Sequence, residues 1–105
     1  MEINITQTAD QAFFSLEGVV DERAADDLKE RFNELNTSVI KEVIFDFARV
    51  KHIGSAGIGK LLLFYKDMAE DGGGIRVENV QGPVYDLFKL LRLDTLFTIT
   101  RQGKA

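Results

Sequence analysis

The alternation of strand-like and helix-like apolar patterns is the feature that most restricts the fold of this chain. Ile3 and Ile5 alternate with polar residues, and residues 12–20 (AFFSLEGVV) form a second β-rich run. Amphipathic helical stripes and short apolar runs then follow one another. The predicted order is β-β-α-β-α-β-α-β, which is typical of an α/β fold: a mostly parallel mixed sheet with crossover helices and one antiparallel strand at the start.

Three segments have the periodicity of amphipathic helices. The first follows Asp21, a suitable N-cap, and the third begins near Pro83, because a first helical turn tolerates proline. The second covers residues 57–69, and its expected apolar face comprises Ile58, Leu61, Leu62, Tyr65 and Met68. The remaining strands are predicted at 42–47, 75–80 and 96–100. Gly18 interrupts the second strand and predicts a bulge or a close backbone approach there.

Composition excludes several classes of function. The 105 residues suit one domain over 1–105, and 17 acidic against 13 basic residues disfavour nucleic-acid binding. The chain has no cysteine and one histidine, which removes thiolate nucleophiles, cysteine metal sites and paired-histidine zinc motifs. No signal-like start and no membrane-spanning apolar run are present. We therefore expect a soluble, cytoplasmic domain without a metal or cofactor.

A glycine-rich segment, residues 54–60 (GSAGIGK), is the most informative stretch. Its spacing matches the first seven positions of a P-loop, but the eighth position needs Ser or Thr to hold magnesium and is Leu61 here. Residues 48–53 also separate it from the end of the predicted strand. Nucleotide hydrolysis is thus disfavoured. A simpler interpretation is a tight strand-to-helix connection in which the glycines adopt backbone angles that other residues disfavour.

Ser55 offers a sharper hypothesis. It lies just before a predicted helix N-terminus, where free amide groups and the helix dipole favour negative charge. A phosphoserine there would change the surface charge without unfolding the domain. Leu63 falls outside the predicted apolar stripe, so either a neighbouring helix covers it or it belongs to a partner-binding patch near Ser55. His52 has no evident orienting carboxylate, so a Ser-His catalytic pair is disfavoured.

Carboxylates dominate the polar face of the first predicted helix. The residues are Asp26, Asp27, Glu30 and Glu34. Such a face is usually solvated, and the alternative is a charged docking surface.

Several segments, in order, resemble the STAS domain of bacterial anti-sigma factor antagonists. Residues 14–21 (FSLEGVVD) resemble the family's second strand, its glycine and the aspartate that opens the first helix, and residues 43–47 (VIFDF) resemble the central strand. Residues 54–59 (GSAGIG) are similar to the signature D-S-[ST]-G-[LI]-G. Residues 83–88 and 93–99 are similar to the C-terminal helix and strand. The resemblance covers nearly the whole chain and implies the STAS fold.

The resemblance also implies a regulatory, non-enzymatic function. In this family the serine after the signature aspartate is phosphorylated by a partner kinase that doubles as an anti-sigma factor. The unphosphorylated antagonist binds that partner and frees the sigma factor, and a serine phosphatase resets the switch. Ser55 matches the phosphorylated serine, and Asp21 matches an acidic residue near the binding surface. The partner-binding residues implied are Asp21, Gly54, Ser55, Ala56, Gly57, Ile58, Gly59 and Leu63.

Two departures from the signature keep other functions open. Gly54 replaces the aspartate, and Ala56 replaces the second hydroxyl residue, so Ser55 is the one candidate phosphosite in the loop. Some STAS domains act without phosphorylation, for example as small subunits of lipid-transport machinery. A phosphorylation-independent binding subunit is therefore the main alternative, and a nucleotide-binding enzyme that uses residues 54–60 is a remote one.

Overall fold

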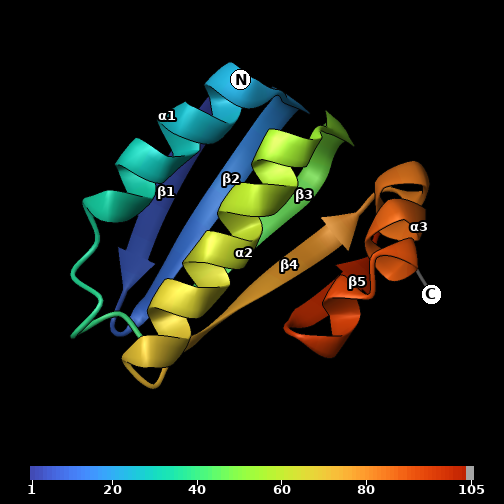
Figure 1. Ribbon diagram of the computed structural model, residues 1–105. Coiled ribbons are helices and arrows are strands. Elements are labelled where there is room, and N and C mark those ends of the chain that lie inside the picture. The colour runs from blue at the N-terminus through green and yellow to red at the C-terminus, as the bar shows by residue number, and fades with distance from the viewer. Residues whose placement is uncertain (104–105) are drawn as a thin grey trace.

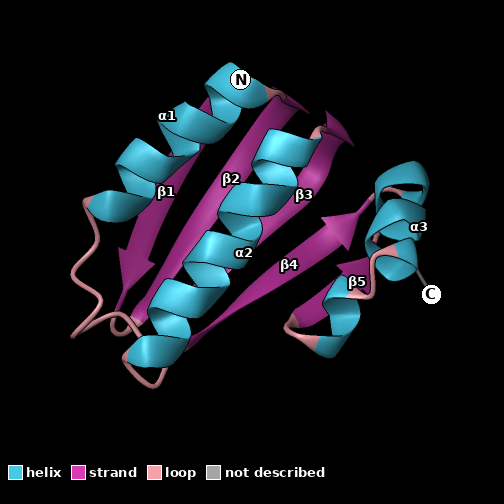
Figure 2. Ribbon diagram, viewed as in Figure 1, coloured by secondary structure: helices cyan, strands magenta, loops and turns pink. Residues whose placement is uncertain are grey.

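The computed structural model describes residues 1–103, which form one mixed sheet with helices packed against it. The strands are β1 (Glu2–Thr8), β2 (Gln11–Val20), β3 (Glu42–Ile53), β4 (Gly74–Val80) and β5 (Thr98–Arg101). Their spatial order is β1-β2-β3-β4-β5 (Figure 2). The β1–β2 pair is antiparallel and the other pairs are parallel, which confirms the predicted α/β class and the opening hairpin.

Three α-helices and a short 3₁₀ helix connect the strands. They are α1 (Glu22–Asn33), α2 (Ser55–Glu70), α3 (Gly82–Leu90) and η1 (Leu93–Thr95). α1 and α2 lie side by side over one face of the sheet, and α3 lies at the β4–β5 end (Figure 1). Phe64 of α2 stacks on Phe32 of α1 and on Phe45 of β3, with ring centroids 4.2 and 5.7 Å apart, so aromatic packing ties both helices to the sheet centre.

The second strand contains the predicted bulge. Gly18 has a φ of +121°, a conformation that side chains rarely adopt, and the register between β2 and β3 shifts between Gly18 and Val19. Downstream of this irregularity, Val20 pairs with Ile53 at the end of β3. The bulge therefore sets how the ends of β2 and β3 align.

Two strand boundaries differ from the prediction. β3 does not end at Phe47 but continues to Ile53, because it remains paired with β2 although exposed polar residues separate the buried Val50 and Ile53. The last strand begins at Thr98 rather than Leu96, since residues 93–95 form η1. The extension of β3 matters for the site, because α2 now follows that strand after a single residue, Gly54.

The buried face of α2 also differs from the prediction. Leu62 is not on it: its side chain is 37% exposed, whereas Leu61, Phe64 and Met68 are fully buried. Ile58 and Tyr65 are half-buried beside the core. The buried stripe begins at Gly57 and continues at i+4, i+7 and i+11. Because a glycine is not recognised as apolar in a periodicity pattern, the sequence did not show which face of the helix is buried.

Candidate functional site

The N-termini of α1 and α2 lie next to each other at one edge of the sheet. Val20 at the end of β2 pairs in parallel with Ile53 at the end of β3, and the Gly54 amide donates a hydrogen bond of 2.9 Å to the Val20 carbonyl. Each of these strands leads directly into a helix, so Asp21 and Gly54 are neighbours in space. Two residues that sequence analysis assigned to partner binding, 33 positions apart, are thereby brought together.

The two helices begin with different caps. The Asp21 carboxylate accepts a hydrogen bond of 2.9 Å from the Ala24 amide, which confirms the predicted N-cap. Gly54 occupies the same position before α2 and has no side chain with which to cap it. The first intrahelical donor of α2 is the Ile58 amide, which bonds the Gly54 carbonyl at 3.1 Å. The amides of the preceding turn therefore face outward at the positive end of the helix dipole.

Ser55 is the first residue of α2 and is exposed at this uncapped end. Gly54 has φ −91° and ψ 177°, an extended conformation open to any residue, and a Cβ there would meet only the Val20 carbonyl oxygen, at 3.8 Å. An aspartate would fit at this position. The backbone at Gly54 therefore does not explain why the signature aspartate is absent from this sequence.

The two glycines of the first turns of α2 have different surroundings. A Cβ on Gly57 would lie 2.7 Å from Ile53 Cγ1 and 2.7 Å from Val20 Cγ1, so this glycine lets α2 approach the ends of β2 and β3. Gly57 is buried and faces the sheet, away from the surface where we expect a partner. A Cβ on Gly59 would meet no atom within 4 Å. Packing therefore explains Gly57 and leaves Gly59 without a structural reason.

One exposed face of α2 gathers the remaining candidate residues. At 3.6 residues per turn, Ser55, Gly59 and Leu62 lie within about 60° of each other around the helix axis, and all three are exposed. Ala56, Ile58 and Leu63 are half-buried at its margins. Leu62 was missed because the apolar run LLLFY concealed which leucine points outward. Its separation of seven residues from Ser55 was the signal that could have identified it. We call Asp21, Gly54, Ser55, Gly59 and Leu62 the α2 surface.

The geometry of residues 54–60 is not that of a phosphate-binding loop. α2 already begins at Ser55, so six of the seven P-loop-like positions are inside the helix, where their amides turn along the helix axis. Lys60 Nζ lies 3.8 Å from Asp26 Oδ1 of α1, and this ion pair joins the two helices. Among residues 1–103 no group of three His, Asp or Glu side chains is placed to hold a metal. No helix in that range has the length and apolarity needed to cross a membrane.

The match to a family model covers nearly the whole chain. The STAS domain model matches residues 2–103. The chain belongs to the STAS domain family. Its five-stranded mixed sheet and three helices form the STAS fold, as the sequence resemblance implied.

Solved structures of several other proteins have the same fold at low sequence identity. The Bacillus anti-sigma factor antagonist SpoIIAA in its unphosphorylated form is 14% identical, with a TM-score of 0.77 over 98% of this chain and 90% of that one. An anti-sigma factor antagonist from Mycobacterium paratuberculosis is 20% identical, with a TM-score of 0.81 over 94% and 84% of the two chains. A sulfate transporter family protein from Wolinella succinogenes is 17% identical, with a TM-score of 0.77 over 89% and 78%. At these identities the likeness establishes the fold alone.

Proposed function

We propose that this STAS domain is an anti-sigma factor antagonist whose α2 surface binds a serine kinase that doubles as an anti-sigma factor. Phosphorylation of Ser55 by that kinase ends the binding, and a serine phosphatase restores it. The observation that carries the proposal is the exposed hydroxyl of Ser55 at the uncapped start of α2, next to the N-terminus of α1. The domain acts by binding, in the cytoplasm, and performs no chemistry of its own.

The fold accepts a phosphate at Ser55 without strain. The side chain is exposed, and the free amides at the start of α2 together with the helix dipole favour a negative group there. The added charge of about −1.5 to −2 therefore changes the surface and leaves the core intact.

A bound partner experiences the same phosphate very differently. Gly59 and Leu62 form an uncharged patch beside Ser55, and the absent side chain of Gly59 lets a partner's backbone come close. Phosphate in the centre of such a contact has to lose its hydration without a paired cation, which costs several kcal/mol. Each 1.4 kcal/mol weakens binding about tenfold, so one phosphate suffices to release the partner.

Binding measurements with serine kinases from the same organism test this proposal. Calorimetry with Ser55→Ala and Ser55→Asp is expected to give dissociation constants that differ by at least about tenfold, with Ser55→Ala the tighter. Ser38→Asp is the matched control, because Ser38 is exposed in the loop before β3, at the opposite end of that strand from Ser55. Equal affinity of the two Ser55 variants for every kinase that binds would refute the switch.

A second candidate function is a phosphorylation-independent binding subunit. Gly54 is the observation that favours it, since the loop lacks the signature carboxylate although the backbone has room for one. A fold shared with a sulfate transporter family protein is consistent with such a role. In that case the α2 surface still binds a partner, but Ser55 remains unmodified in cells and Ser55→Asp binds as tightly as the unchanged protein.

A further inference from the structure

β1 is an edge strand that lacks the usual protection against pairing with another chain. It pairs with β2 on one side, and within residues 1–103 no strand lies along its other edge. Its seven residues (EINITQT) include no proline, lysine or arginine, and its pairing with β2 has no bulge. Edge strands without such features are templates for an additional strand.

The opposite edge of the sheet is built differently. β5 has four residues and ends at Arg101, whose guanidinium carbon lies 5.6 Å from the centre of the Tyr85 ring. A short edge strand that ends in a charged residue offers little for another strand to pair with. Of the two edges of the sheet, the β1 edge is therefore the one better suited to accept an additional strand.

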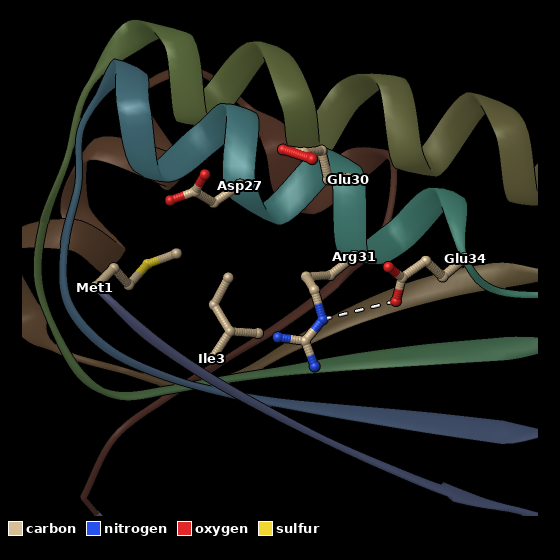
Figure 3. A pocket seen from close by; sticks show the side chains of 6 residues that line it. All are labelled: Met1, Ile3, Asp27, Glu30, Arg31 and Glu34. Carbon is tan, nitrogen blue, oxygen red and sulfur yellow. Dashed lines mark ion pairs between the residues drawn. The ribbon is translucent and has the colours of Figure 1, made fainter.

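A groove runs between β1 and α1. It has a volume of about 290 Å³ and is lined by Met1, Ile3, Asp27, Glu30, Arg31 and Glu34 (Figure 3). Its β1 side is apolar, with Ile3 half-buried and Met1 42% exposed, and its α1 side is charged. A second hollow of about 300 Å³ shares Met1 and Asp27 with this groove and extends it to Asp21. Together the two hollows run along α1 beside Met1 and Ile3, at the start of β1.

The charges of the groove favour a cation. Between β1 and α1, Arg31 Nε lies 3.8 Å from Glu34 Oε1, so the one guanidinium of the first hollow is already paired (Figure 3). Arg23 lines only the second hollow, next to Asp21. Asp27 and Glu30 have no ion pair with any residue of the described range, in contrast to Asp26 on the α2 side of the helix, which pairs with Lys60. A second copy of this chain on the same edge would bring like charges together, which disfavours self-pairing.

We propose that the β1 edge and this groove receive an extended segment of a partner protein with lysine or arginine at alternate positions. The segment adds a strand to β1 through main-chain hydrogen bonds, and its basic side chains reach the carboxylates of α1. Asp27 and Glu30, the two carboxylates without an ion pair in the described range, are separated by about 4.5 Å along the helix axis. Same-face side chains of a strand are spaced by about 7 Å, so two basic residues at i and i+2 reach this row together. The site is independent of Ser55.

Peptide titrations followed by the amide resonances of the full chain test this proposal. The probe is a short capped peptide of alternating threonine and valine in which two threonines, two positions apart, are replaced with lysine. It is expected to shift the amides of β1 and of residues 27–34 in a saturable way. The same peptide with glutamate in place of lysine is expected to bind at least about tenfold more weakly.

Charge reversal on α1 provides the matched comparison. The double variant Asp27→Lys, Glu30→Lys is expected to reverse the preference between the lysine and glutamate peptides. Glu70→Lys with Asp86→Lys, a double reversal at exposed positions of α2 and α3, is expected to leave the preference unchanged. Three results would each overturn the proposal: no saturable shifts with either peptide, shifts centred away from β1, or dimerisation of the free protein through β1 in sedimentation experiments.

Discussion

Replacing Gly57 and Gly59 of α2 by alanine should have opposite effects on the free energy of unfolding. Gly57→Ala puts a Cβ 2.7 Å from Val20 Cγ1 and from Ile53 Cγ1, well inside van der Waals contact. Both neighbours are buried, β-branched residues at the ends of paired strands, so neither can move aside easily. Overpacking of this kind costs about 1–3 kcal/mol, and the better helix propensity of alanine recovers about 1 kcal/mol.

Gly59→Ala meets no such obstacle. No atom lies within 4 Å of the added Cβ, so only the helix propensity changes. We therefore expect Gly59→Ala to raise the free energy of unfolding by about 0.5–1 kcal/mol, and Gly57→Ala to lower it by up to about 2 kcal/mol. In a domain of this size each 1 kcal/mol corresponds to about 4–8 °C in Tm.

Urea unfolding monitored by far-ultraviolet circular dichroism measures the free energy of unfolding of both variants in the same assay. A Gly57→Ala protein stabilised as much as the Gly59→Ala protein would refute the close approach of α2 to β2 and β3. A destabilised Gly59→Ala protein would refute the open surroundings of that residue. Gly59→Ala is also expected to weaken partner binding despite its greater stability, because its methyl group projects from the α2 surface.

Three further predictions concern other parts of the domain. Gly54→Asp is expected to stabilise the protein by a few tenths of a kcal/mol, measured by urea unfolding, since it adds a carboxylate cap to α2. Leu61→Ala is expected to cost about 2–5 kcal/mol in the same assay through a cavity under α2; a cost below that of the exposed Leu62→Ala would contradict the assigned helix face. The 2.8 Å hydrogen bond from Lys89 lowers the pKa of Asp94 from its ordinary value, so the pair stabilises the fold above the unfolded-state pKa and loses this effect as the pH falls through the lowered one. Lys89→Met should therefore reduce the loss of Tm on acidification, and an unchanged acid profile would contradict the assignment.

The order of elements and the α/β class could be predicted from the sequence because each segment has a clear period. The N-cap at Asp21, the bulge at Gly18 and proline in the first turn of α3 were all confirmed, since each depends on local backbone chemistry. The end of β3 was not predictable. Between Phe47 and Ile53 the strand is held by pairing with β2 rather than by an apolar pattern of its own.

The candidate site likewise contains features that local sequence predicts and features that depend on tertiary contacts. Ser55 could be placed near a helix N-terminus from the glycine-rich segment, but the helix was predicted to begin at Gly57 and begins at Ser55. The assignment of Leu62 to the outside and Gly57 to the inside depends on how α2 is rotated against Val20 and Ile53, a tertiary contact without a signature in the local sequence. The groove at β1 likewise arises only when α1 packs against β2 and α2 and leaves a hollow beside the start of the edge strand.

The modification state of Ser55 in the cells that make this protein is the most direct test of the proposed switch. Trypsin cleavage after Lys51 and Lys60 releases residues 52–60 (HIGSAGIGK), in which Ser55 is the one hydroxyl residue, so a phosphorylated peptide assigns the site without ambiguity. Mass spectrometry is expected to find both the unmodified and the phosphorylated peptide, in proportions that change with growth conditions. Only the unmodified peptide, under every condition in which the protein is present, would contradict the account and favour the phosphorylation-independent subunit.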